Sequence, residues 1–223
     1  LNGVPVGRLL EEKFHLPVRM ENDVSACACG EYYFGNHRGS SRRMLFLAIG
    51  TGIGGGMMVD GALLRLARGC LGDPGHVIVD PSGQSPCRCG GNGCMEAVAS
   101  GWALVERAKR LGVDATPREI FARARAGDAA LARLAGDAAR AVGVGLATLC
   151  VLLNPDTVAL GGGVAEDAGE PFRALVGDTL RAHAVPLFAQ EARVVAARVG
   201  ANAGLLGAAA LILFPPAHAP AAA

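Results

Sequence analysis

The sequence predicts an α/β fold in which helices cover both faces of a mixed sheet. Apolar segments of strand-like composition, such as residues 43–49 and 157–160, alternate with segments whose apolar residues recur at helical spacing. Both of these segments run directly into a glycine-rich turn. The chain has 223 residues, of which 51% are hydrophobic, so it can bury a substantial core.

The first part of the chain predicts two helices and three strands. The chain begins with Leu1 in the middle of a helical pattern, so we expect further sequence upstream of it. Asp23 stands at or near the N-cap of the second helix. The glycines of residues 50–56 are expected to form the turn of a hairpin or another tight connection between strands. The helices are expected at residues 1–14 and from Asp23 to about residue 35, and the strands at residues 16–20, 43–49 and 57–61.

The remainder of the chain continues the alternation of helices and strands. The longest helical pattern stops at Asn154-Pro155, because proline cannot continue a helix. The tail, PPAHAPAAA, has too little to bury and is expected to be disordered. Helices are expected at residues 102–110, 128–153, 171–184 and 203–214, and strands at residues 157–160 and 193–197.

Composition and charge argue against several classes of partner and place the chain in the cytoplasm. The formal net charge is +1 and 18% of the residues are charged, so no basic stripe for nucleic acid is visible. The apolar segment 203–214 is too short to cross a bilayer, so we expect no membrane association. Seven cysteines, an odd number, occur without a secretory leader, which indicates a reducing compartment.

Four potential metal ligands lie close together in the segment GHVIVDPSGQSPCRCGGNGCME, residues 75–96. A structural zinc ion requires four tetrahedral nitrogen or sulfur donors, and the glycines here let the backbone wrap three cysteines around one ion. Free thiols beside an unrelated histidine are the alternative, which this density of ligands disfavours. A closed site leaves no position for a reactive water, so the expected ion is structural. The predicted ligands are His76, Cys87, Cys89 and Cys94.

Two glycine-rich turns are candidates for binding phosphate. One is GTGIGGG at residues 50–56, which contains Thr51, and the other is GGG at residues 161–163. Backbone amides in such turns can approach phosphate oxygens without interference from side chains. Either could instead be an ordinary tight turn. Neither matches the Walker motif or the dinucleotide fingerprint, so a different nucleotide-binding fold is required.

Carboxylates near these turns are candidates for chemistry on a sugar. Asp23, in the segment ENDV, could accept a proton from a hydroxyl group that attacks a phosphoryl group, or it could simply cap a helix. The segment that carries the predicted metal ligands, residues 73–96, is called the metal loop below. Asp73, His76 and Glu96 all lie in it and would suit the vicinal hydroxyls of a sugar. The alternative for Asp73 is a turn-forming role before Pro74.

The segments ENDV, GTGIGGG, GDPGH, CRCGGNGCME and LGGGV, in this order and spacing, resemble the ROK family of bacterial sugar kinases and sugar-responsive repressors. The resemblance runs from about residue 1 to residue 210. It implies an actin-like ATPase (ribonuclease-H-like) α/β fold of two lobes, with ATP and sugar in the cleft between them. The chain would then comprise mostly the C-terminal lobe, together with the end of the N-terminal lobe.

The resemblance also implies a domain plan and binding partners. Besides the hexose, we expect ATP, Mg²⁺ and structural Zn²⁺ as cofactors and a homodimer or larger homo-oligomer. The expected parts are residues 1–41 from the N-terminal lobe, residues 42–202 as the ATPase lobe with its zinc loop at 73–96, residues 203–214 as a terminal helix packing towards the hinge, and residues 215–223 as the tail.

By position, the resemblance implies roles for particular residues in phosphorylation of a hexose, glucose or a related sugar, at a primary hydroxyl group. Asp23 would be the catalytic base. The sugar would be held by Asn22, Asp23, Asp73, His76 and Glu96, and the nucleotide would lie against Thr51, Gly52, Gly162 and Gly163.

This sequence departs from the family pattern at three places. Asp73 stands where glutamate is usual, which moves the carboxylate by about one methylene and would alter sugar preference. Leu66 stands where glycine is common. The family's N-terminal aspartate and glycine turn has no counterpart in these residues. The alternatives to a kinase are therefore the sugar-sensing domain of a ROK transcriptional repressor and a truncated, inactive sugar-binding homologue.

Overall fold

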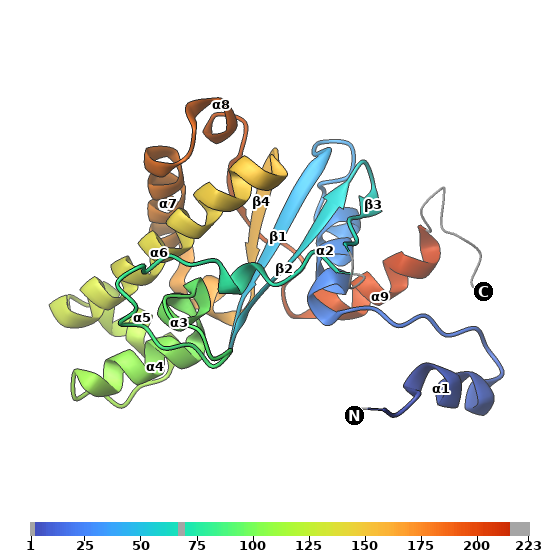
Figure 1. Cartoon of the computed structure of the whole chain (residues 1–223), viewed down its shortest axis with the longest axis horizontal. Helices are drawn as coiled ribbons and strands as arrows, with labels where there is room; N and C mark the ends of the chain where they lie inside the picture. Colours follow the sequence, from blue (N-terminus) through green and yellow to red (C-terminus); the bar gives the residue numbers. More distant parts are fainter. Residues whose placement is uncertain (1–2, 67–69, 215–223) are drawn as a thin grey trace.

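A five-stranded mixed sheet forms the centre of the molecule in the computed structural model, which describes residues 3–66 and 70–214 (Figure 1). The strand order is β3-β2-β1-β4-β5. β1 pairs antiparallel with β2 and parallel with β4, and β4 pairs parallel with β5. The strands are β1 (Arg43–Ile49), β2 (Ile53–Val59), β3 (Ala62–Leu63), β4 (Thr157–Gly161) and β5 (Arg193–Ala196).

Helices cover both faces of this sheet, as the sequence predicts. α2 and α9 lie on one face, and α6 and α7 lie on the other (Figure 1). The α-helices are α1 (Val6–Phe14), α2 (Asp23–Phe34), α3 (Met95–Ala99), α4 (Gly101–Arg110), α5 (Pro117–Arg125), α6 (Ala129–Leu153), α7 (Gly163–His183), α8 (Pro186–Ala189) and α9 (Ala203–Leu213). Two 3₁₀ turns, η1 (Pro74–His76) and η2 (Gly200–Asn202), complete the described elements.

Alternation along β1 divides the apolar core into two layers. Met44 and Phe46 pack in the cluster formed with α2 and α9, whereas Leu45 and Leu47 pack in the larger cluster formed with α6 and α7. Successive side chains of a strand point to opposite faces, so a strand buried on both faces is apolar throughout. This explains why residues 43–49 could be predicted as a strand from composition alone.

The predicted hairpin turn is wrong in its extent. Gly54, Gly55 and Gly56 belong to β2, and only residues 50–52 form the turn, closed by a 2.9 Å hydrogen bond from Gly50 N to Gly52 O. The glycines lie inside a strand because other elements approach its backbone closely. A Cβ atom on Gly56 would lie 2.8 Å from the Cβ of Ala28 in α2.

Two other predicted elements differ in the structure. Residues 16–20 form no strand, because none of the five described strands pairs with their backbone. α7 begins at Gly163, eight residues before the expected start, and contains a break at Gly169, where φ is +71°. The predicted helix 171–184 corresponds to the part after this break, where Pro171 stands in a first turn that tolerates proline. The sequence analysis did not predict β3, α3, α5 or α8.

α2 and α9 pack against each other through glycines. A Cβ atom on Gly30 would lie 2.3 Å from the carbonyl oxygen of Ala203, and one on Gly207 would lie 1.7 Å from that of Ala26. Each close approach of the two backbones therefore occurs at a glycine, whose lack of a Cβ atom leaves room for the other helix. The predicted terminal helix is confirmed as α9 and packs on α2. The domain boundaries stay predictions, and the predicted tail at residues 215–223 lies outside the described residues.

α6 is the one described helix that is long and apolar enough to cross a membrane. Its most apolar window is 56% buried inside the protein, where residues such as Val142 and Leu146 belong to the larger core cluster. These properties are those of a core helix.

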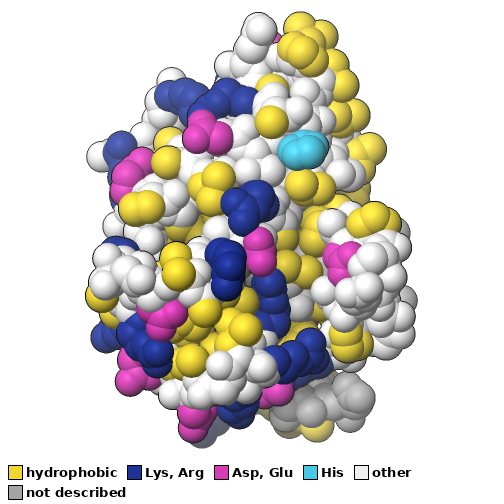
Figure 2. Space-filling view, turned by 90° about the vertical axis from the view of Figure 1, so that its left-hand side faces the viewer, with side chains coloured by type: hydrophobic (Ala, Val, Ile, Leu, Met, Phe, Trp, Pro, Cys, Tyr) yellow, Lys and Arg dark blue, Asp and Glu magenta, His cyan; other side chains and the backbone are white. Residues whose placement is uncertain are grey.

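On the molecular face shown in Figure 2, lysine and arginine side chains are interspersed with acidic and apolar ones.

Candidate functional site

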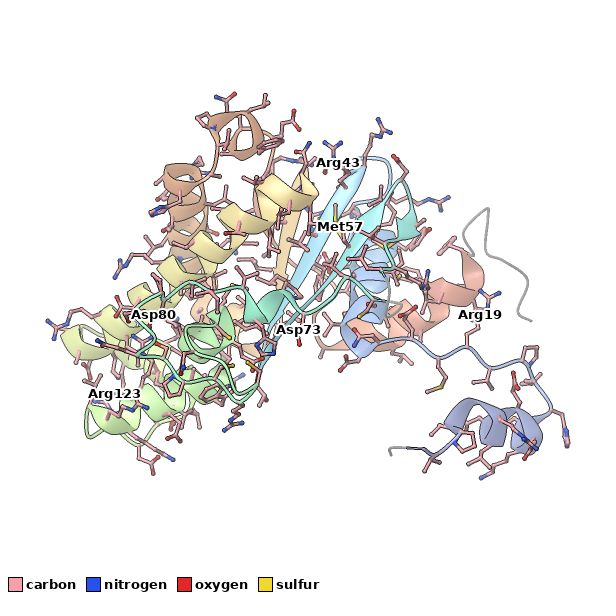
Figure 3. The ribbon with its side chains drawn as sticks, viewed as in Figure 1. Arg19, Arg43, Met57, Asp73, Asp80 and Arg123 are labelled. Carbon is pink, nitrogen blue, oxygen red and sulfur yellow. The ribbon has the colours of Figure 1, made fainter. Side chains whose placement is uncertain are left out.

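A cleft of about 840 Å³ brings together most of the predicted site residues. It lies where the start of α2, the turn between β1 and β2, the loop before η1 and the start of α3 converge. Figure 3 shows Asp73 beside the ends of β1 and β2, with Asp80 farther along the same loop. The predicted site residues that line this cleft are Asn22, Asp23, Thr51, Gly52, Asp73, Glu96 and Gly162.

The start of α2 positions Asn22 and Asp23 differently. Asn22 is the N-cap, and its side chain accepts a 3.0 Å hydrogen bond from Ser25 N. Asp23 is the first helical residue and is exposed in the cleft, where its Oδ1 accepts from Val24 N at 2.8 Å. Because Asn22 caps the helix, the capping role considered for Asp23 belongs to its neighbour. The Asp23 carboxylate remains accessible to a ligand in the cleft.

Glu96 connects the metal loop to the glycine turn. It stands in the first turn of α3, and its Oε2 accepts a 2.9 Å hydrogen bond from Ile53 N. A Cβ atom on Gly52 would lie 2.6 Å from the same oxygen, so glycine is required there for Glu96 to reach the turn. The turn that carries Thr51 is therefore held against the acidic side of the cleft.

The four predicted metal ligands form a cluster in which all donor atoms lie within 4.8 Å of one another. The Sγ atoms of Cys89 and Cys94 are 3.7 Å apart, and Cys87 Sγ is 3.7 Å from His76 Nδ1. A tetrahedral zinc ion with Zn–S bonds of about 2.3 Å would hold its sulfur ligands about 3.8 Å apart. The geometry and the chemistry of the donors thus fit zinc.

Backbone contacts hold the metal loop in place. Gly93 has φ of +78°, and a Cβ atom there would lie 2.0 Å from the carbonyl oxygen of Asp80. Gly93 N donates to Ser85 O at 2.7 Å, and Met95 N donates to Val77 O at 2.9 Å. The sequence analysis predicted that the glycines near the cysteines give the backbone conformational freedom. Gly93 uses it, because a residue with a side chain would not fit at this position.

The thiols of the cluster have unequal acidities. The Gly91 amide, together with Cys87, lowers the pKa of Cys89. Burial, assisted by the neighbouring thiols of Cys89 and Cys87, raises the pKa of Cys94 to about 12. A cation is the ordinary means of keeping such crowded sulfurs deprotonated.

His76 joins this cluster to the cleft. Its Nε2 lies 3.3 Å from Oδ2 of Asp73, while its Nδ1 faces the cysteines. Among the residues that line the cleft, Asp73 is the one that His76 contacts, and His76 itself is not among them. Gly75 allows this close packing, since a Cβ atom there would lie 2.1 Å from the carbonyl oxygen of Ile53.

A second cleft, of about 810 Å³, opens on the other side of the glycine turn. Gly50 and Thr51 line both clefts, and Gly163 lines only the second. Gly162, with φ of +88°, is the N-cap of α7, so the first amides of this helix start between the two clefts.

The sequence analysis missed the residues that form the outer wall of the second cleft. Trp102 stands at the start of α4, and Arg118 of α5 forms a 3.0 Å ion pair with Asp167 of α7. A signal for this region was present, because Thr116 and Glu119 form a capping box that marks the start of α5. Leu66, which the sequence analysis singled out as a departure from the expected glycine, lines the first cleft.

Comparisons with known proteins agree with this architecture. The model of the ROK family matches residues 1–214. A glucokinase of Halalkalibacterium halodurans is 34% identical over 91% of this chain, which spans 66%, about two thirds, of that protein.

Two solved structures are similar in fold. A ROK family glucokinase from Streptomyces griseus in complex with glucose and AMPPNP has a TM-score of 0.80 at 35% identity, covering 93% of this chain and 72% of that one. A ROK family transcriptional regulator, a homologue of the E. coli MLC protein, has a TM-score of 0.82 at 27% identity, covering 92% and 54%. The predicted actin-like fold is confirmed by this likeness.

Proposed function

This chain belongs to the ROK family, and we propose that it transfers a phosphoryl group from ATP to a primary hydroxyl group of a hexose, glucose or a related sugar. The observation that carries the proposal is the position of the Thr51 turn, which lines an acidic cleft on one side and a second large cleft on the other. An acceptor in the first cleft and a phosphate donor in the second would meet at this turn.

In this proposal the acceptor hydroxyl lies against Asp23, which acts as the general base. Asp23 is exposed in the cleft at the rigid start of a helix, where a carboxylate can take the proton as the hydroxyl oxygen attacks the γ-phosphorus. Asn22, Asp73 and Glu96 would hold the other hydroxyls. His76 would act mainly through Asp73, since its imidazole contacts that carboxylate.

The nucleotide would extend from the turn into the second cleft. Thr51 and Gly52 would contact the β- and γ-phosphates through the hydroxyl and the backbone amides, and Gly162 and Gly163 would lie beside them at the start of α7. Mg²⁺, which accompanies ATP, would spread the negative charge of the transferred group. The cleft of about 810 Å³ has room for a nucleotide.

We further propose that His76, Cys87, Cys89 and Cys94 hold a structural zinc ion. Its role would be to fix the loop and so to orient the His76 ring, whose other nitrogen faces Asp73. With four protein ligands the ion has no open position, so it would take no part in the chemical step.

A sugar-sensing domain is the second candidate, because a transcriptional regulator of the family has the same fold. A sensor requires the acidic cleft and the metal loop but no phosphate-binding turn. The Thr51 turn is intact and opens onto both clefts, which favours the kinase. A sugar-binding protein without activity is the third possibility, and the assay below distinguishes it.

The test is ADP formation from ATP with a panel of hexoses, including N-acetylated ones, in wild-type protein, Asp23→Asn and Asp114→Asn. Asp114 is an exposed aspartate that lines neither main cleft and serves as the matched control. We expect Asp23→Asn to lower turnover about 10²-fold with nearly unchanged hexose affinity. Hexose binding without turnover in the wild type would point to a sensor or an inactive homologue.

A further inference from the structure

One cation in the second cleft comes from the metal loop. Arg88 stands between two of the proposed zinc ligands, Cys87 and Cys89, and lines the same cleft as Trp102 and Thr51. Its guanidinium carbon lies 4.5 Å from the centre of the Trp102 ring, which is the geometry of a cation–π contact. The metal loop therefore presents a positive charge to the cleft in which the nucleotide is proposed to bind.

Trp102 connects this arginine to both sites. The indole packs against the apolar cluster formed by Cys87, Cys94 and Ala97 of the metal loop and α3. Its backbone amide donates to Thr51 O at 3.4 Å, and the preceding residue, Gly101, donates to Gly50 O at 2.8 Å. The tryptophan thus lies between the metal cluster and the turn proposed to hold phosphate.

Arg88 forms no ion pair among the described residues, and the glutamate that lines the cleft, Glu106, is paired with Lys109 at 3.6 Å. Among residues 3–66 and 70–214, no carboxylate lies within 4.0 Å of its guanidinium nitrogens. The other arginine of the cleft, Arg118, is paired with Asp167. Stacking on the indole holds the guanidinium in place while leaving its N–H donors free for an anion.

We propose that Arg88 contacts the phosphate chain of the nucleotide and that the metal loop, by holding Arg88 on Trp102, makes nucleotide affinity depend on the bound metal. This inference rests on the proposed kinase function. It adds a second role for the metal, because the same loop that orients the sugar-binding Asp73 also supplies a ligand for the phosphate donor.

Intrinsic fluorescence gives a direct measurement, since Trp102 is the single tryptophan of the chain. Titration of the full chain with the non-hydrolysable analogue AMPPNP should change this fluorescence. For Arg88→Ala we expect a roughly tenfold weaker affinity, the size of one charged hydrogen-bond contact, with unchanged hexose affinity and metal content. Arg88→Lys should recover only part of the loss, because an ammonium lacks the planar stacking surface. Arg133→Ala, an exposed arginine of α6 that lines neither main cleft, is the control and should match wild type.

The dependence on metal is tested by repeating the titration after chelation and after adding zinc back. Metal-free wild type should resemble Arg88→Ala, and metal-free Arg88→Ala should lose little more, because both changes remove the same contact. Equal AMPPNP affinity in wild type and Arg88→Ala would overturn this inference alone. Absence of AMPPNP binding to the wild type would instead overturn the kinase proposal on which it rests.

Discussion

Asp73 is the acidic residue of the cleft that lies beside the metal cluster. Its carboxylate lines the cleft and lies 3.3 Å from His76 Nε2, but it is not a member of the metal cluster. The aspartate side chain is short, and its contact with His76 limits its movement. In the proposed function it would therefore bind only those sugars whose hydroxyl groups come close enough to it. Sugar preference and metal binding should therefore be separable at this position.

We expect Asp73→Ala to weaken hexose binding about tenfold, as the loss of a charged hydrogen bond would. Asp73→Glu, which lengthens the side chain by one methylene, should retain binding but change the order of preference among hexoses. Calorimetric titration with several sugars measures both effects. Zinc content should stay constant, and a variant that also lost its metal would show that Asp73 supports the loop rather than the sugar.

Glu31 is a buried carboxylate outside the proposed chemistry. It accepts hydrogen bonds from Arg198 N, Val199 N and His37 Nε2 at 2.9–3.0 Å, which joins α2 to the segment after β5. Burial raises the pKa of Glu31, but the hydrogen bonds from His37 and from the two amides outweigh it and hold the pKa below its ordinary value. The ionised form is therefore the one that stabilises the fold.

Glu31→Gln should lower the free energy of unfolding by about 2–4 kcal/mol near pH 7, because it weakens a buried charged network. The folded-state pKa is the depressed one, so this contribution is fully present above the unfolded-state pKa of glutamate, about 4.3, and is lost as the pH falls through the folded-state pKa. Urea unfolding at pH 7 and at pH 4 should show the difference from wild type shrinking at the lower pH. Glu12→Gln, in an exposed pair with Arg8, should change stability by no more than about 0.5 kcal/mol at either pH.

At the scale of elements, the contact between α2 and α9 depends on glycine. Gly207→Ala would place a methyl group on the backbone of Ala26, so we expect a loss of about 1–3 kcal/mol in unfolding free energy. Gly177→Ala is the matched control, since its added Cβ would meet only the flexible side chain of Arg181, at 3.5 Å. It should be neutral or stabilising by up to about 1 kcal/mol. Equal effects of the two substitutions on thermal unfolding would contradict the described packing.

Elements were predictable from the sequence where local pattern and burial agree. Residues 43–49 are apolar because both faces of β1 are covered, and α6 has an aspartate N-cap, Asp128, and a proline just beyond its end. Gly54 to Gly56 misled the prediction because glycine signals a turn locally, whereas here α2 and η1 require small residues within a strand. That requirement comes from tertiary packing, which no local pattern encodes.

The first cleft of the candidate site could be predicted from the sequence, and the second could not. Its carboxylates and metal ligands lie in short motifs, so their residue types and spacing were informative before the fold was known. The second cleft was missed because Trp102, Arg118 and Asp167 come from three helices far apart in the sequence. Arg88 was likewise overlooked, since its importance depends on contact with Trp102.

At the scale of the whole molecule, the metal loop contributes a side chain to each cleft, whereas the Thr51 turn lines both. Asp73 reaches the first cleft beside His76, and Arg88 reaches the second beside Trp102. Assembly into a homodimer or larger oligomer is a separate prediction, which light scattering of the purified protein would check. The proposed roles of both clefts depend on the proposed zinc ion of this loop.

The most direct test counts the metal and measures hexose binding in the same sample. We predict one zinc ion per chain, loss of hexose binding after chelation together with faster hydrogen exchange in residues 73–96, and recovery of both on adding zinc. Protein that binds its hexose with full affinity while containing no transition metal would contradict the account.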